Sequence, residues 1–185
     1  MKVLGIDFSL NGTGLSIFED GDIIFKRVFV KSLNKNRRSD STYIKSPEFK
    51  TPEQKLDWVC HTILSYCTDL DLICMEDHIG KYYSWMDGYG ILKYLFRCRC
   101  LPYIMISPSQ LKKFATGHGN ADKEQMSVAL KQQYNLDLDY IGSSANNIVD
   151  ATWLSILGGL YFKFISNTST QVYPQQKEIL EKLTI

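Results

Sequence analysis

Three acidic residues lie in apolar stretches, where an ionised carboxylate is costly unless a partner neutralises it. Asp7 lies within the string VLGIDF, Glu76 ends LICME, and Asp150 lies within IVDATWL. A divalent cation would be a shared partner, because hard oxygen ligands from separate elements can converge on Mg²⁺ or Mn²⁺. Each acid also has a separate explanation as a strand-end, turn or capping residue. The residue types therefore leave open both a metal site and three unrelated acids.

The elements that would position these acids follow from the hydrophobic pattern. Turn signals at 11–12 and 20–22 separate short β-branched and aromatic runs, which predicts an antiparallel meander over 3–9, 14–19 and 23–31. Later apolar runs predict strands at 70–75 and 103–106, and helices that begin near Pro52 and span about 82–100, 107–114, 121–134, 144–165 and 175–182. This order predicts an α/β fold with a mixed five-stranded sheet, three antiparallel strands followed by parallel additions, and helices on both faces.

Length and composition match one globular domain, with 185 residues of which 44% are hydrophobic and 22% charged. We expect this domain to span 1–166, with a basic loop at 32–51 and a tail at 167–185. No apolar stretch reaches the roughly 20 residues of a membrane span, and no charged leader precedes the first strand. We therefore expect no membrane attachment and a cytoplasmic location. The five cysteines form no CxxC pair, which favours reduced packing residues over disulfides or a zinc site.

The net charge of +1 conceals two basic segments. Residues 26–50 hold eight basic and two acidic side chains, and residues 81–113 hold six basic and one acidic. Such segregation is typical of a phosphate-binding face around an acidic pocket, although an unevenly charged solvated surface is equally consistent with it. Arg37 and Arg38 are candidate phosphate contacts in the basic loop. Tyr82 and Tyr83 follow Glu76 closely and could stack on unpaired bases or form the buried face of the next helix.

Several motifs of this chain resemble, in the same order, those of the RuvC family of Holliday junction resolvases. They are GID at 5–7 with NGTG at 11–14, ME at 75–76, QLK at 110–112, GHGNADKEQM at 117–126, and NxxDA at 147–151. The resemblance covers about residues 3 to 160. It implies an RNase H-like fold and a homodimer that nicks two strands of a four-way DNA junction during DNA recombination and repair.

The resemblance also implies roles for individual residues. Asp7, Glu76 and Asp150 match the metal-binding carboxylates of a site holding two Mg²⁺ ions, for which Mn²⁺ can substitute. Lys112 and Lys123 match lysines near the scissile phosphate, and Lys113 is a further DNA-binding candidate that can equally be a surface charge. Lys123 is the stronger of these, since a cation in a helix's first turn opposes the helix dipole unless an anion binds there.

Asn147 departs from the family pattern, which places an acid or a histidine three residues before the helix aspartate. An amide oxygen can still coordinate Mg²⁺ but brings no charge. Asn147 is therefore the expected fourth ligand, with Asn146 as an alternative one position earlier.

Three other functions compete with junction resolution. One is an RNase H-like nuclease with a different branched DNA or RNA preference, and another is a junction-binding protein that has lost cleavage, which Asn147 motivates. The third is an ATPase or kinase of the actin, sugar-kinase and Hsp70 class, because the segment 7–14 also resembles their first phosphate motif. The chain lacks the second phosphate loop and the length that this third class needs.

Overall fold

The computed structural model describes residues 1–30, 42–77, 83–138, 145–168 and 172–183. Within them lies one mixed sheet, and its strands stand in the order β4-β3-β2-β1-β5-β6. The strands are β1 (Lys2–Asp7), β2 (Gly14–Glu19), β3 (Asp22–Val30), β4 (Tyr43–Lys45), β5 (Leu72–Glu76) and β6 (Tyr103–Ile106). The helices are α1 (Pro52–Ser65), α2 (Tyr83–Cys98), α3 (Pro108–Thr116), α4 (Lys123–Tyr134), α5 (Ala145–Ile165) and α6 (Pro174–Leu180).

The sheet confirms the predicted order but contains one more strand. Strands β1, β2 and β3 form the antiparallel meander, and β5 and β6 join β1 as parallel additions. The prediction of five strands was wrong because β4 lies in the segment expected to be a loop. This strand has three residues and pairs in parallel with the end of β3, from Val28↔Tyr43 to Val30↔Lys45. So short an edge strand depends on its partner and leaves no alternating pattern in the sequence.

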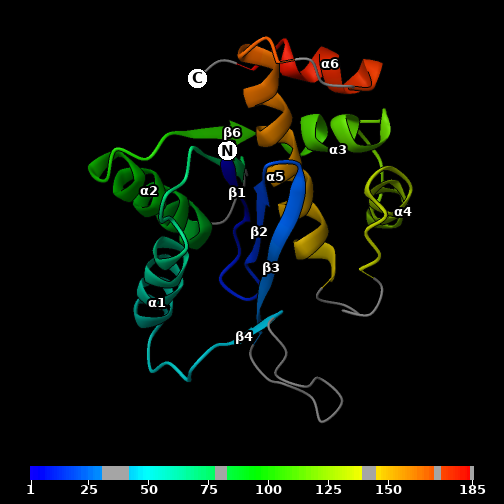
Figure 1. Cartoon of the computed structure of the whole chain (residues 1–185). Helices are drawn as coiled ribbons and strands as arrows, with labels where there is room; N and C mark the ends of the chain where they lie inside the picture. Colours follow the sequence, from blue (N-terminus) through cyan, green and yellow to red (C-terminus); the bar gives the residue numbers. More distant parts are fainter. Residues whose placement is uncertain (31–41, 78–82, 139–144, 169–171, 184–185) are drawn as a thin grey trace.

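Helices cover both faces of the sheet, as predicted (Figure 1). On one face, α1 and α2 pack on the side chains that include Leu4 and Ile6 of β1. On the other, α5 crosses the sheet and α3, α4 and α6 pack around it, on side chains that include Val3 of β1. Neighbouring residues of β1 therefore face different layers, as strand geometry requires.

Helix α5 lies unusually close to β1 and β2, and glycines permit it. A Cβ added at Gly5 would overlap the backbone of Ala151, and one at Gly14 would overlap the backbone of Asn147. Gly158 offers the same room on the helix side, against Val3 and Cys74. The close approach brings the start of α5 directly over the carboxyl end of β1.

Helix α5 also corrects the expectation that no segment is long enough for a membrane span. By length and composition alone, its segment Asn146–Ile165 passes that test, with a mean hydropathy of 1.4. Within its most apolar stretch, 78% of the residues are buried inside the protein. The burial is that of a domain's central core helix.

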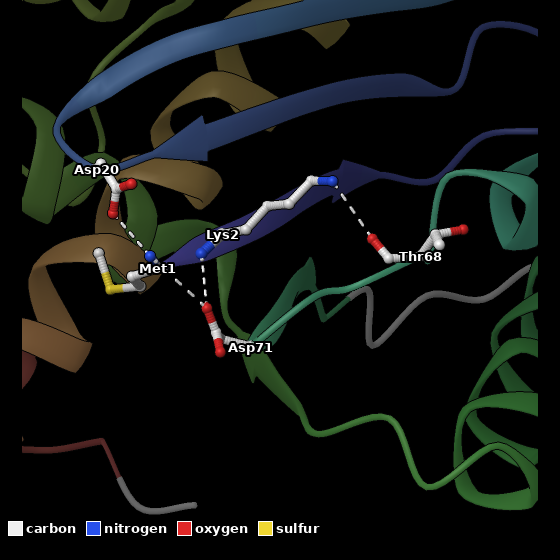
Figure 2. A network of polar contacts seen from close by, with 5 residues as sticks. All are labelled: Met1, Lys2, Asp20, Thr68 and Asp71. Atoms are coloured by element: carbon white, nitrogen blue, oxygen red, sulfur yellow. Dashed lines mark hydrogen bonds and ion pairs between the residues drawn. The ribbon is translucent and has the colours of Figure 1, made fainter.

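Polar contacts tie the amino end of β1 to its neighbours (Figure 2). The α-amino group of Met1 pairs with Asp20 at 2.7 Å. The backbone N–H of Lys2 donates to Asp71 at 2.7 Å, and its ammonium group donates to the carbonyl of Thr68 at 3.4 Å. These contacts anchor β1 to the β2–β3 turn and to the segment before β5, at the end opposite Asp7.

Helix α6 follows the predicted position closely and packs onto the domain. Its residues Ile179 and Leu180 belong to the core that α3, α4 and α5 share. Lys113 of α3 pairs with Glu178 of α6 at 2.7 Å. The segment expected as a tail thus contributes a helix to the core.

The cysteine expectation was correct for part of the set. All five thiols are free, and Cys60 and Cys74 are buried. Cys98 and Cys100 at the end of α2 are exposed, so the expectation that they pack in the core was wrong. Both lie where the helix ends and the chain turns, with Cys100 in the left-handed region at φ 53°.

Candidate active site

Two of the three predicted acids are brought together by strand register. Strands β1 and β5 run parallel with Ile6 opposite Met75, so Asp7 and Glu76 are the next neighbours along the two strands. Both follow the alternation that places Val3 and Leu72 on the α5 face of the sheet. Each retains only 6% of its exposure. The two carboxylates therefore lie side by side at the edge of the sheet, mostly shielded from water.

Asp150 completes the cluster from the helix above. It is 3% exposed, and ligand oxygens of Asp7, Glu76 and Asp150 all lie within 4.8 Å of one another. Asp150 Oδ2 pairs with the ammonium group of Lys123. Its Oδ1 is buried and has no hydrogen-bond partner among the described residues. An orphaned anionic oxygen is costly in such a site.

This donor set fits a divalent cation. Three carboxylates at this spacing repel one another, and hard oxygen ligands are those that Mg²⁺ and Mn²⁺ prefer. A cation bound between them would neutralise the cluster and give Asp150 Oδ1 a partner. A buried acidic triad suited to a divalent metal is thus present, as the sequence predicted.

Lys123 is placed over the acids by the start of α4. Asp122 caps this helix, accepting from the backbone N–H of Gln125 at 2.8 Å, while the Gln125 side chain accepts from the Asp122 N–H at 3.0 Å. Lys123 is the first residue after the cap. Burial lowers the pKa of its ammonium group, the negative charges of Asp7 and Glu76 oppose that shift, and the positive charge of Lys112 adds to it. The structure therefore places Lys123 beside the acids, with Lys112 close enough for its charge to act on Lys123.

Asn147 lies beside the turn between β1 and β2. Its amide nitrogen donates to the carbonyl oxygen of Gly12 across 135 residues of sequence. A Cβ at Gly12 would contact the same amide nitrogen. Asn147 thus has a definite contact that its role as a fourth ligand did not require, and only its amide oxygen remains for a metal.

Five further residues were predicted to contact DNA. Lys113 pairs with Glu178 of α6 while its side chain stays 36% exposed, so it is a surface charge with a structural partner, and its DNA contact stays a prediction. Arg37, Arg38 and Tyr82 lie outside the described residues, as does the side chain of Tyr83. Their proposed DNA contacts stay predictions.

One residue near the acids was missed by the sequence analysis. Tyr89 of α2 is 6% exposed and packs edge-on against Phe8, with ring centroids 5.1 Å apart. Burial raises the pKa of its phenol, and the negative charges of Asp7, Glu76 and Asp77 raise it further. The sequence offered no signal for it, because Tyr89 reaches the strand ends only through the packing of α2.

The chain resembles known proteins in sequence and in structure. No family model matches the chain. The crossover junction endodeoxyribonuclease RuvC of Ehrlichia ruminantium (strain Welgevonden) is 29% identical over 143 residues, covering 74% of this chain and 84% of that protein. Thermus thermophilus RuvC, solved in complex with Holliday junction substrate, has a TM-score of 0.64 at 16% identity, covering 91% of this chain and 97% of that one. The chain is RuvC-like in sequence and in fold.

A more distant structure has the same architecture. The resolvase of fowlpox virus, solved with its substrate Holliday junction DNA, has a TM-score of 0.52 at 16% identity, with 90% of this chain and 99% of that one covered. At these identities the structural likeness establishes the fold. The RNase H-like fold and the RuvC resemblance that the motifs implied are both confirmed.

Proposed function

We propose that the protein is a structure-selective endonuclease that resolves four-way DNA junctions by metal-dependent, paired nicking. The observation that carries the proposal is the buried Asp7, Glu76 and Asp150 cluster with Lys123 ion-paired to it. It lies within a RuvC-like fold, and relatives of that fold have been solved with Holliday junction DNA. Three buried carboxylates so close together are electrostatically costly, and such clusters are typical of functional sites.

The residues divide the work between holding the metal and stabilising charge. Two Mg²⁺ ions, or Mn²⁺ in their place, would supply Lewis acidity at the phosphate and a bound water of lowered pKa. The carboxylates of Asp7, Glu76 and Asp150 would hold them, with the amide oxygen of Asn147 as a fourth, uncharged ligand. The ammonium group of Lys123 offsets the negative charge that develops on the phosphate, and Lys112 adds positive potential nearby.

Branched DNA is the proposed substrate. The basic segments 26–50 and 81–113 would contact phosphates, with Arg37 and Arg38 among the candidates, which gives affinity without sequence selectivity. Stacking of Tyr82 and Tyr83 on unpaired bases would favour an opened junction over a duplex.

A homodimer would supply the second active site that paired nicking needs. Among the described residues, α2 exposes apolar side chains one turn apart, with Ile91 at 40% and Tyr94 at 67% exposure. Cys98 lies one turn beyond Tyr94 and is also exposed. A two-fold contact would bury this face against its own copy.

The test compares cleavage of a labelled four-way junction with that of duplex, flap and RNA/DNA hybrid, in Mg²⁺ and in EDTA. We expect symmetric nicks in the junction alone, only with Mg²⁺, and none from Asp150→Asn. Equal cleavage of flaps or hybrids would favour an RNase H-like nuclease of another preference. Tight junction binding without nicks in Mg²⁺ would favour a non-cleaving junction-binding protein.

A further inference from the structure

Trp153 joins α5 to α4 immediately beside the candidate active site. It is completely buried, and its indole N–H donates to the backbone carbonyl of Met126 at 3.1 Å. Trp153 lies three residues after Asp150, and Met126 lies three residues after Lys123. Residues three apart share a helix face. The pair Asp150 to Lys123 and the pair Trp153 to Met126 are therefore successive contacts along the same two helices.

The ring of Trp153 also contacts aromatic side chains of α3 and α4. Phe114 of α3 meets it edge-on, with centroids 6.0 Å apart and planes at 83°, and Tyr134 of α4 does so at 5.7 Å and 83°. Such contacts are directional as well as apolar. Phe114 is two residues after Lys112, so the helices that carry Lys112 and Lys123 both contact this indole.

We propose that Trp153 is a positioning residue for Lys123: it fixes the register of α4 on α5 so that the ammonium group meets Asp150. The inference rests on the proposed function only for its catalytic consequence. Lysine has four rotatable side-chain bonds and cannot define its own location. The indole N–H can define that location, because a shift of α4 along α5 would leave this buried donor without its acceptor.

The test is a double-mutant cycle with Trp153→Phe and Lys123→Ala, measured in two ways. Phenylalanine keeps an aromatic ring at the site but removes the N–H. The first measurement is the unfolding equilibrium in EDTA, which does not depend on activity. We expect coupling, with the double variant's unfolding constant departing from the product of the single effects by about fivefold or more. Independent effects would overturn the inference.

The second measurement is single-turnover junction cleavage at saturating Mg²⁺. We expect Trp153→Phe to slow cleavage by about ten- to a hundredfold with junction affinity unchanged, and to have little further effect once Lys123 is alanine. Fully multiplicative losses would overturn the inference. If coupling is found in unfolding but Lys123→Ala cleaves normally, the inference on register stands and the catalytic role of Lys123 fails.

Phe96→Leu provides the matched control. Phe96 of α2 is also fully buried, but it lies in the core on the opposite face of the sheet, where its ring packs on Tyr103. This variant should lower stability and remain independent of Lys123→Ala in both measurements. Coupling as strong as that of Trp153 would mean that general core damage explains the result, and would overturn the proposal.

Discussion

At the scale of single residues, the acidic cluster is a place where stability and function conflict. Asp7, Glu76 and Asp150 place ligand oxygens within 4.8 Å of one another in a mostly buried site. We expect Asp7→Asn, Glu76→Gln and Asp150→Asn each to reduce nicking by about a hundredfold or more, since each removes a charged ligand. Junction binding should persist, because the basic segments are unchanged.

Two of these variants should also change the melting temperature, in a way that depends on the metal. In EDTA, Asp7→Asn and Glu76→Gln should raise the melting temperature, because repulsion within the cluster falls. In Mg²⁺ the melting temperature of the parent should rise to that of the variants, because the folded parent binds the ion. Cleavage at the parent's rate by any of the three would remove that residue from the site.

If Asn147 is the fourth ligand, it meets two requirements, a hydrogen bond to the turn and an oxygen for the metal, that an acid could not meet together. Its amide nitrogen donates to Gly12, and a carboxylate in its place would set an anionic oxygen against that carbonyl. We expect Asn147→Asp to lower the Mg²⁺ concentration for half-maximal cleavage, by adding charge, and to lower stability in EDTA by about 1 kcal/mol through the lost hydrogen bond.

Asn147→Ala separates these two roles. It should lose the same hydrogen bond as Asn147→Asp and need more metal than the parent. The measurements are a metal titration of single-turnover cleavage and a melting curve for each variant. If Asn147→Ala shows the parent's metal dependence, Asn147 serves only the turn and is no ligand.

At the scale of elements, the sequence predicted what local patterns encode. The meander carries turn signals, and the helix starts at Pro52, Ser107 and Asp122 carry capping signals. The long helix that ends at Ile165 is encoded by a continuous apolar run. Strand β4 and the contacts of Tyr89 and Trp153 carry none, since each exists only through partners distant in sequence. The apolar contexts of the three acids singled them out and the motif resemblance grouped them into one site, whereas the Asn147 contact to Gly12 required the structure.

Helix α6 yields a pH prediction at this scale. Hydrogen bonds from Lys113 and Lys182 lower the pKa of Glu178 from 4.5 to about 2. The folded state then holds the Glu178 proton less tightly than the unfolded state. Its contribution to stability is fully present above pH 4.5 and is lost as the pH falls toward about 2.

We expect Glu178→Gln to lower the melting temperature at pH 7 and to converge with the parent as the pH falls from 4.5 toward about 2. Glu181→Gln is the control, because Glu181, at the end of α6, pairs with Lys177 of the same helix at 3.9 Å and not with α3 among the described residues. Melting curves across that pH range provide the measurement. A constant difference between Glu178→Gln and the parent at every pH would show that the ion pair with α3 does not stabilise the fold.

At the scale of the whole molecule, one chain provides one acidic cluster within the part that the structure describes. Two symmetric nicks then require two chains related by a two-fold axis. The exposed Ile91 and Tyr94 on α2 are the proposed contact. Tyr94→Asp would place a charge in that contact, so it should yield a monomer by light scattering while the melting temperature changes little, because the side chain is 67% exposed.

Mixed dimers test whether the two sites act as a pair. Parent chains and Asp150→Asn chains carrying different affinity tags can be combined and purified in sequence, so that each dimer has one intact cluster. We expect these dimers to nick one strand of a junction held in a supercoiled plasmid and to release few linear products, whereas the parent releases mostly linear DNA. If the mixed dimer released linear products at the parent's yield, a single site would cut both strands. That result would contradict the proposal that paired nicking requires a homodimer.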